Sequence, residues 1–244
     1  MSSRLGSTLI VMPAFNEEAS VGDVIREVFA KMPGVGVLVV DDGSSDDTTR
    51  VARAAGARVA TLPFNLGVGG AMRTGFRYAI ENGYDNVVQI DSDGQHDPSS
   101  VPALLAELDS ADLVLGARFA GEGGYVVRGP RWWAMKSLAV ILSRTSRATL
   151  TDATSGYRAS GPRAVALFAE HYPAEYLGDT IEALVIASRS GLRIKQVAVS
   201  MRPRAGGIPS HNPFRSAAYL GRAAMALVFA FTRPPSTYRV GGSA

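Results

Sequence analysis

Aspartates gather directly after the apolar run at residues 87–90, in the stretch QIDSDGQHDP. Asp91, Asp93 and Asp97 are so close in sequence that their carboxylates should repel one another unless a cation lies among them. Mg²⁺ and Mn²⁺ prefer hard oxygen ligands and are typically held by one or two carboxylates together with substrate phosphates. Asp91 and Asp93 therefore predict a divalent-metal site at the end of a strand.

The neighbouring residues leave the remaining ligands open. Gln95 could add a carbonyl oxygen, or His96 an imidazole nitrogen. The alternative is a structural loop rich in Asp and Gly, in which Asp97 caps a helix that begins at Pro98. The chain has no cysteine, which excludes thiolate zinc sites and disulfides, and no two of its three histidines share metal-ligand spacing.

Two other nucleotide-binding patterns can be compared with the glycine-rich stretch that begins at Gly67. Residues 67–72 carry Met72 where a dinucleotide fingerprint needs its third glycine. Residues 70–76 have the glycine spacing of a P-loop but carry Phe76 in place of the phosphate-binding lysine. Neither a dehydrogenase nor a P-loop ATPase is favoured.

Strand and helix patterns alternate through the first half of the chain. Strands that are apolar on both faces and alternate with helices indicate a parallel sheet with helices on both sides. Sites in such sheets lie at the carboxyl ends of the strands, where the clusters Asn16-Glu17, Asp41-Asp42 and Asp91-Ser92-Asp93 fall. Apolar runs predict strands at residues 7–15, 34–44, 57–64 and 86–94, and helical periodicity predicts helices over residues 17–32, 44–56 and 67–83.

The second half is less regular. The charge-free core of its last apolar segment, residues 223–232, is too short to span a bilayer. It could lie in a membrane interface, form a dimer interface or pack onto the domain. The patterns predict a strand at residues 111–119, a glycine-rich loop at 120–130, a helix over 131–150, a turn-rich insertion at 151–160, a helix over 177–191, a strand at 193–201 and an apolar helix over 216–235.

Charge is distributed unevenly along the 244 residues. Nine Lys and Arg residues and no acidic residue follow Glu182, so the net charge of +3 leaves −6 on the first 182 residues. This asymmetry predicts that the C-terminal quarter contacts phosphates or anionic lipid, a solvated basic face being the alternative. Nucleic acid is not an expected partner, because no binding motif for it appears. The first apolar run is too short for a signal peptide, so a cytoplasmic protein is expected.

Six motifs follow one another along the chain: VMPAFNEEASVGDVI, VLVVDDGSSDDTTRVA, NLGVGGAMRTGF, QIDSDGQHDP, LGARF and DATSGYR. Their order resembles that of the family 2 inverting glycosyltransferases of GT-A fold, and most of all the dolichol- and polyprenyl-phosphate sugar synthases, over residues 8–215. The resemblance implies an α/β, Rossmann-like GT-A fold with a mostly parallel sheet, helices on both faces and a helical extension on the C-terminal, acceptor side. It implies a transferase domain at 1–215, with a nucleotide-binding half at 8–117 and an acceptor half at 118–215, and an apolar helix and tail at 216–244.

On the donor side, the resemblance places the nucleotide at the ends of the first strands. One of the paired acids Asp41 and Asp42 would recognise the base or the ribose, and glycines would let the backbone approach the nucleotide. Ser44, Ser45 and Asp46 are better explained as caps of the next helix. The residues implied to bind the nucleotide are Pro13, Ala14, Phe15, Glu17, Asp41, Asp42, Gly67, Gly69, Asp91 and Ser92, and those implied to bind Mg²⁺ or Mn²⁺ are Asp91, Asp93 and Gln95.

On the acceptor side, the resemblance implies arginines that bind phosphate, because the planar guanidinium engages two phosphate oxygens at once. Asp152 would shape the acceptor site, with Ser155 and Arg158 nearby. His211 follows Ser210 where the family commonly has lysine, and Tyr157 stands where phenylalanine is commoner, so the acceptor stays open. The implied phosphate ligands are Arg118, Arg128, Arg131, Arg202 and Arg204, with a salt-bridged helix surface as the alternative for Arg131.

The implied reaction is a single displacement at the anomeric carbon of a UDP-, GDP- or dTDP-sugar, with inversion and a divalent metal. A polyprenyl-phosphate acceptor is already ionised and needs no base, whereas a hydroxyl acceptor needs a carboxylate to take its proton. Asp179 and Glu182 are candidates for that base, and a capping box at a helix start is the alternative. The catalytic candidates are Asp93, Asp152, Asp179, Glu182, Arg118 and Arg131.

Three functions remain open from the sequence. The first is transfer to polyprenyl phosphate, with a peripheral contact at the inner face of the cell membrane. The second is transfer to a hydroxyl of a glycan or small molecule, and the third is a catalytically silent scaffold that binds nucleotide-sugars. A homo-oligomer is compatible with each.

Overall fold

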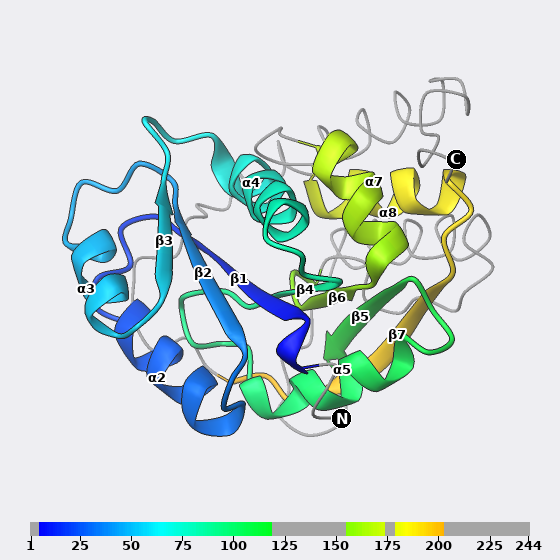
Figure 1. Ribbon diagram of the computed structural model, residues 1–244, viewed down its shortest axis with the longest axis horizontal. Helices are drawn as coiled ribbons and strands as arrows, with labels where there is room; N and C mark the ends of the chain where they lie inside the picture. The colour runs from blue at the N-terminus through cyan, green and yellow to red at the C-terminus, as the bar shows by residue number, and fades with distance from the viewer. Residues whose placement is uncertain (1–4, 119–154, 174–178, 203–244) are drawn as a thin grey trace, which may run out of the picture.

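The computed structural model describes residues 5–118, 155–173 and 179–202, which form a seven-stranded sheet in the order β3-β2-β1-β4-β6-β5-β7 (Figure 1). Strands β1, β2, β3 and β4 pair in parallel, as do β5 and β7, whereas β6 runs antiparallel to both of its neighbours, β4 and β5. The strands are β1 (Thr8–Ala14), β2 (Gly36–Asp41), β3 (Arg58–Thr61), β4 (Asn86–Gln89), β5 (Leu113–Arg118), β6 (Arg158–Ser160) and β7 (Ile194–Val199).

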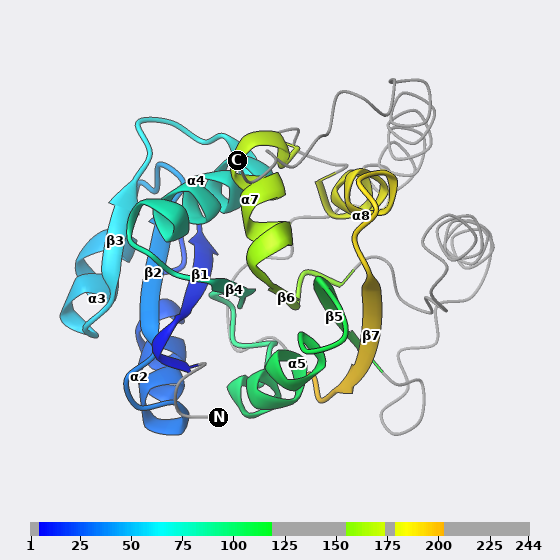
Figure 2. The same ribbon diagram turned by 45° about the vertical axis from the view of Figure 1, so that its right-hand side comes forward.

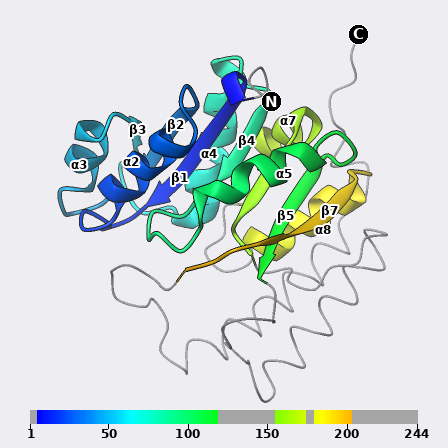
Figure 3. The same cartoon turned by 90° about the horizontal axis from the view of Figure 1, so that it is seen from below.

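Helices cover both faces of this sheet, as expected. Helices α4, α7 and α8 lie on one face and α2, α3 and α5 on the other (Figure 2), and the second group stands in front of the sheet in Figure 3. The helices are α2 (Val21–Lys31), α3 (Thr48–Ala54), α4 (Gly67–Glu81), α5 (Val101–Glu107), α7 (Pro162–His171) and α8 (Asp179–Arg189), with the short 3₁₀ turn η1 (Pro98–Ser100) before α5.

Strand β1 shows why its sequence is a continuous apolar run. Leu9 and Val11 enter the core beneath α4, whereas Ile10 and Met12 enter the core beneath α2, because successive side chains of a strand point to opposite faces. All four side chains are fully buried, and each contributes about 1.5–3 kcal/mol relative to an exposed position. A strand in the middle of a parallel sheet is buried on both faces, so it needs apolar residues at every position.

Strand β6 is the main departure from the expected elements. The prediction of a turn-rich insertion over residues 151–160 is wrong at its end, because Arg158–Ser160 forms a buried strand between β4 and β5. Three residues reading Arg-Ala-Ser carry no strand periodicity, and only pairing with Gln89 on one side and Leu115 on the other makes them a strand. The patterns also gave no helix at α5 or α7, although each has a proline in its first turn.

Two helices begin later than expected, and several predicted segments lie outside the described residues. The helices expected from residues 17 and 44 begin later, at Val21 and Thr48, because the preceding residues form loops. The expected loop at 120–130, the helices over 131–150 and 216–235, and the tail lie outside the described residues. Among the helices of the described ranges, none is long and apolar enough to span a membrane.

Asp112 joins three elements at the edge of the sheet where β5 and β7 begin. Its Oδ2 accepts hydrogen bonds from the backbone N of Arg193 at 2.8 Å and from the Arg163 guanidinium at 3.1 Å. The side chain is almost fully buried. Burial by itself would raise the pKa of Asp112, but the hydrogen bonds from Arg193 and the charge of Arg163 hold this pKa below its ordinary value.

This lowered pKa predicts how stability depends on pH. A carboxylate whose pKa is lower in the folded state stabilises the protein above its unfolded pKa, and this stabilisation is lost as the pH falls towards the folded pKa. We expect Asp112→Asn to lower the free energy of unfolding at pH 7 by about 1–3 kcal/mol, and the deficit to shrink between about pH 5 and pH 3. Urea unfolding at several pH values measures it.

The exposed Asp85 provides the control. Asp85→Asn should change the free energy of unfolding by less than about 0.5 kcal/mol at every pH. A deficit for Asp112→Asn that stays constant from pH 7 to pH 3 would contradict the role of ionised Asp112.

Candidate active site

The loops after β1 and β2 are joined by hydrogen bonds. Asn16, with a left-handed φ of 55°, donates its backbone N–H to Ser44 Oγ at 2.9 Å and accepts one at Oδ1 from Ser45 N at 2.9 Å. Glu17 N donates to Thr48 Oγ1 at 2.8 Å. Ser44 and Ser45 therefore contact the neighbouring loop instead of capping α3, contrary to expectation.

The ends of β1, β2 and β4 meet at one edge of the sheet, as the sequence predicted. Strand β1 lies between the other two, and the backbone carbonyls of Pro13 and Ala14 accept hydrogen bonds from both sides. Ser92 Oγ donates to Pro13 O at 3.0 Å, and Asp42 N donates to Ala14 O at 2.8 Å. Phe15 follows with 44% of its surface exposed, so an aromatic ring is available beside these strand ends.

Asp41 and Asp42 are both buried, and backbone groups bind both carboxylates. Asp41 accepts from Ser44 N at 2.9 Å and from the Thr49 hydroxyl. The two oxygens of Asp42 accept from Leu66 N at 2.7 Å and from Gly67 N at 2.8 Å, so Asp42 binds the N-terminus of α4. A carboxylate is favourable there because a helix N-terminus carries unpaired N–H groups and a positive dipole end.

The surroundings of Asp42 have opposing effects on its ionisation. Burial raises the pKa of Asp42, the two backbone N–H groups act against this, and the neighbouring Asp41 charge adds to the rise. Gly67 has a left-handed φ of 80°, which side-chain-bearing residues rarely adopt. The glycine is thus required by the backbone turn that brings its N–H to Asp42, and Gly69 lies buried in the first turn of α4.

The segment after β4 folds back on itself. Asp93 Oδ1 accepts from Gln95 N at 3.0 Å, and Asp91 N donates to His96 Nδ1 at 3.0 Å. His96 is 2% exposed and stacks on Tyr157, with ring centroids 4.6 Å apart. Because Nδ1 already accepts a hydrogen bond, this nitrogen is not available to a metal. Asp91 is more accessible, with 37% of its side chain exposed.

The strand-end carboxylates fit a cation that also binds phosphate. Asp91 and Asp93 supply hard oxygen atoms, the ligand type that Mg²⁺ and Mn²⁺ prefer. Across the described ranges, no group of three or more His, Cys, Asp or Glu side chains gathers as a complete metal site. A cation at Asp91 and Asp93 would therefore take further ligands from Gln95, as the sequence predicts, from a bound diphosphate or from water.

Asp97 ends this segment and fulfils the capping role expected for it. Its Oδ1 accepts from Ser99 N at 2.9 Å and caps η1, with Pro98 at the first position. The same oxygen lies 2.8 Å from Lys31 Nζ and 3.0 Å from the Arg202 guanidinium. Burial by itself would raise the pKa of Asp97, but the hydrogen bonds from Lys31 and Ser99 and the Arg202 charge hold it far below its ordinary value.

Arg202 is placed differently from its expected role as a phosphate ligand. Its two terminal nitrogens donate to the two oxygens of Glu27 at 2.8 and 2.9 Å, and Lys31 Nζ lies 2.8 Å from Glu27 Oε1. Arg202 N also donates to Gln95 O at 2.9 Å. We define Glu27, Lys31, Asp97 and Arg202 as the ionic latch, since they fasten the segment after β7 to α2 and to the loop after β4.

The acceptor side is described only in part. Arg158 is buried in β6 and donates to Ser155 O and Thr180 O, each at 2.9 Å, so it binds the first turn of α8. Glu182 lies half-buried in that helix. The predicted residues Arg128, Arg131, Asp152 and Arg204 lie outside the described residues, as do the side chains of Arg118 and Asp179.

Several residues that shape the site were not singled out from the sequence. Glu27 and Lys31 form half of the ionic latch, and Gln89 donates from Nε2 to Asp91 Oδ1 at 3.1 Å. Gln89 did carry a signal, because it is the one polar residue in the apolar run at 87–90. Glu27 and Lys31 carried none, since an acid and a base four residues apart are common on exposed helix faces.

The ionic latch predicts coupling between distant residues. In a double-mutant cycle, Glu27→Ala and Arg202→Ala should couple by about 1 kcal/mol in the free energy of unfolding, because a bidentate pair within a network exceeds an isolated surface pair. Urea unfolding of the two single variants and the double variant measures this coupling. The exposed pair Asp23 and Arg26, also on α2, is the control and should couple by less than about 0.5 kcal/mol. Equal coupling in the two cycles would contradict the latch.

Comparison with known proteins agrees with this geometry. The model of the family "Glycosyl transferase family 2" matches residues 9–162. The undecaprenyl-phosphate mannosyltransferase of Micrococcus luteus is 34% identical over 204 residues, which cover 80% of this chain and 84% of that protein. The polyprenol monophosphomannose synthase of Mycolicibacterium smegmatis is 35% identical over 163 residues, 62% of this chain and 60% of that one.

Solved structures show the same fold. The glucosyl-3-phosphoglycerate synthase of Mycobacterium tuberculosis, in complex with Mn²⁺, uridine diphosphate and phosphoglyceric acid, superposes with a TM-score of 0.71. It is 25% identical, and the match covers 96% of this chain and 84% of that one. The sheet with its helices is thus GT-A-like, and the chain belongs to glycosyltransferase family 2 as a nucleotide-sugar glycosyltransferase.

Proposed function

We propose that this protein transfers a hexose from a nucleotide-diphosphate sugar to a polyprenyl phosphate, with inversion at the anomeric carbon and with Mg²⁺ or Mn²⁺. The observation that carries the proposal is the carboxylate pair Asp91 and Asp93 at the end of β4, directly beside the end of β1, whose other neighbour is β2. The relatives from M. luteus and M. smegmatis, whose names specify undecaprenyl phosphate and polyprenol, support the acceptor class.

The donor would bind along the edge formed by β1, β2 and β4. Asp41 and Asp42 are held by N–H and hydroxyl donors, so their position is fixed before a nucleotide arrives. The exposed ring of Phe15 offers a flat apolar surface to a base. Preformed groups of this kind lower the cost of binding because little needs to be ordered.

Asp91 and Asp93 would hold the cation. When bound, this cation neutralises charge on the two donor phosphates and on the departing nucleoside diphosphate. The M. tuberculosis synthase supports the choice of metal, since its structures contain uridine diphosphate with Mn²⁺ in one case and with Mg²⁺ in another. Asp93 is buried and accepts from Gln95 N, whereas Asp91 is more open, so the two carboxylates differ in their exposure to a ligand.

A polyprenyl phosphate brings an oxygen that is already ionised. Catalysis then depends on holding this oxygen in line with the anomeric carbon, and no residue has to remove a proton. The basic residues Arg118, Arg128, Arg131 and Arg204 are the proposed ligands of the acceptor phosphate, and Asp152 would shape their surroundings. Such an acceptor lies in a membrane, so we expect a peripheral enzyme at its inner face.

A second candidate is transfer to a hydroxyl of a small phosphorylated acceptor. It is favoured by the similarity to the glucosyl-3-phosphoglycerate synthase, one structure of which holds glucosyl-3-phosphoglycerate. Glu182 lies in the first turn of α8, and Arg158 fixes that turn through Thr180 O. In this reaction Asp179 or Glu182 would accept the hydroxyl proton.

Nucleotide binding tests the proposed site. UDP, GDP and dTDP are each added with and without Mn²⁺, and thermal or urea unfolding is followed. One diphosphate should stabilise the protein by about 2–3 kcal/mol at a hundred times its Kd, only when Mn²⁺ is present. Asp93→Ala should lose this stabilisation, and the control Asp85→Ala, at the opposite end of β4, should keep it. Stabilisation by none of the three would contradict the proposed donor site.

Transfer assays separate the two acceptors. With a short polyprenyl phosphate, Asp179→Asn and Glu182→Gln should retain activity within a few-fold, because no proton has to be removed. With 3-phosphoglycerate as acceptor, losing the base should lower kcat by about 10²–10⁴-fold. Activity on polyprenyl phosphate that falls by this factor in Asp179→Asn or Glu182→Gln would contradict the base-free reaction.

A further inference from the structure

We propose that Gln89 is a positioning residue that holds the Asp91 carboxylate in its metal-binding orientation. The inference rests on the proposed function, because it assigns a role towards the cation at Asp91 and Asp93. Gln89 is the last residue of β4, is 6% exposed, and donates from Nε2 to Asp91 Oδ1 at 3.1 Å. It would act on the cation through Asp91 and not as a ligand.

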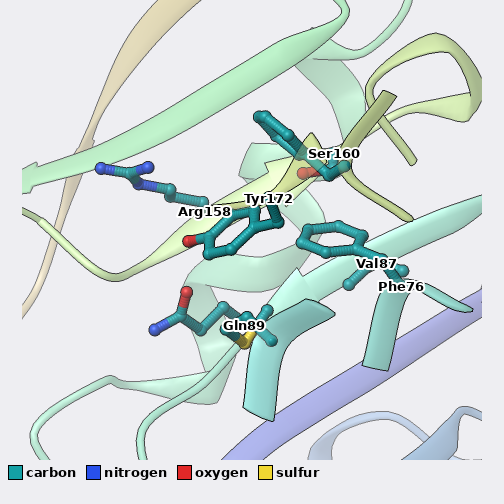
Figure 4. A pocket seen from close by; sticks show the side chains of 8 residues that line it. Phe76, Val87, Gln89, Arg158, Ser160 and Tyr172 are labelled. Atoms are coloured by element: carbon teal, nitrogen blue, oxygen red, sulfur yellow. The ribbon is translucent and has the colours of Figure 1, made fainter. Parts of the chain in front are cut away.

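Because its surroundings are mostly apolar, the Gln89 amide would destabilise the protein if it had no hydrogen-bonding partner. Gln89 lines a small pocket whose other walls are mostly apolar, formed by Met72, Phe76, Val87, Phe168 and Tyr172, together with Ser160 and Arg158 (Figure 4). A buried amide in such a place loses its water and must recover a hydrogen bond inside the protein. Its bond to Asp91 supplies that partner and directs the amide to the carboxylate.

The opposite strand reinforces this arrangement. Gln89 pairs with Arg158 of β6, and both side chains reach towards the same end of the pocket in Figure 4. The guanidinium of Arg158 is engaged by Ser155 O and Thr180 O. An uncharged amide therefore stands next to Asp91, while the cationic side chain is held by backbone carbonyls.

The charge of the hydrogen-bond donor at position 89 affects which ligands Asp91 can bind. A lysine or arginine at position 89 would offset the charge of the carboxylate and weaken its attraction for a divalent cation. A neutral amide fixes the carboxylate and leaves its full negative charge. Only Oδ1 accepts from Gln89, while Oδ2 lies 3.5 Å from His96 Nε2, longer than a good hydrogen bond.

Gly156 provides a second, steric argument for the same contact. A Cβ at this position would lie 3.0 Å from Gln89 Nε2 and 3.4 Å from Asp91 Oδ2. The segment before β6 therefore lies so close to the amide that a side chain at residue 156 would require the amide to shift. Gly156→Ala should push the amide away from Asp91, whereas Gln89→Leu removes the amide and keeps the volume.

The test measures Mn²⁺ affinity by electron paramagnetic resonance, with UDP, GDP and dTDP in parallel. Gln89→Leu should weaken Mn²⁺ binding about tenfold or more in the presence of the diphosphate that binds, as expected for the loss of a group that orients a ligand. The matched control is Gln196→Leu, the same change on β7, and it should retain wild-type Mn²⁺ affinity.

The outcomes separate the inference from the proposed function. Equal Mn²⁺ affinity in Gln89→Leu and the control, while the wild type binds Mn²⁺ with a diphosphate, overturns the role of Gln89 and leaves the function standing. Absence of Mn²⁺-dependent binding in the wild type overturns the function and the inference with it. If Gln89→Leu does not fold, Gly156→Ala decides: weaker Mn²⁺ binding supports the inference and unchanged binding overturns it.

Discussion

The position of β1 between β2 and β4 is the constraint on which the site depends. Three parallel strands end at one edge, and the carbonyls of Pro13 and Ala14 in the middle strand bind the neighbours on both sides. The loops that follow β1, β2 and β4, which are far apart in the sequence, are thereby brought together. Phe15 and Asp93 lie in the segments that follow β1 and β4 at this shared edge.

Carboxylates at this edge are stabilised in three different ways. Asp42 is bound by the N-terminus of α4, Asp97 by Lys31, Arg202 and the start of η1, and Asp91 by the amide of Gln89. The negative charges of Asp42 and Asp97 are balanced by groups of the protein itself. Among the described residues, the hydrogen-bond donor to the Asp91 carboxylate is the neutral amide of Gln89, which does not offset its negative charge. The distribution of partners thus distinguishes a structural acid from one suited to a cation.

The fold and the edge at which β1, β2 and β4 end could largely be predicted from the sequence, because they depend on local patterns. Continuous apolar runs mark β1, β2 and β4, and polar residues after each run mark the edge where they end. Strand β6 could not be predicted, since Arg158–Ser160 becomes a strand only through pairing with residues far away in the chain. Arg202 likewise matched a phosphate-binding pattern, but its carboxylate partners Glu27 and Asp97 are brought to it by tertiary structure alone.

The late position of the short strand β6 in the sequence also matters while the chain is being synthesised. During synthesis from the N-terminus, β4 has β1 on one side, but its other edge stays unpaired until residues 158–160 emerge, about 70 residues after Gln89. An unpaired apolar edge can pair with a second chain. Antiparallel insertion of three residues then closes this edge and joins β5 and β7 to the sheet. The nascent protein is therefore exposed to aggregation in the interval between β4 and β6.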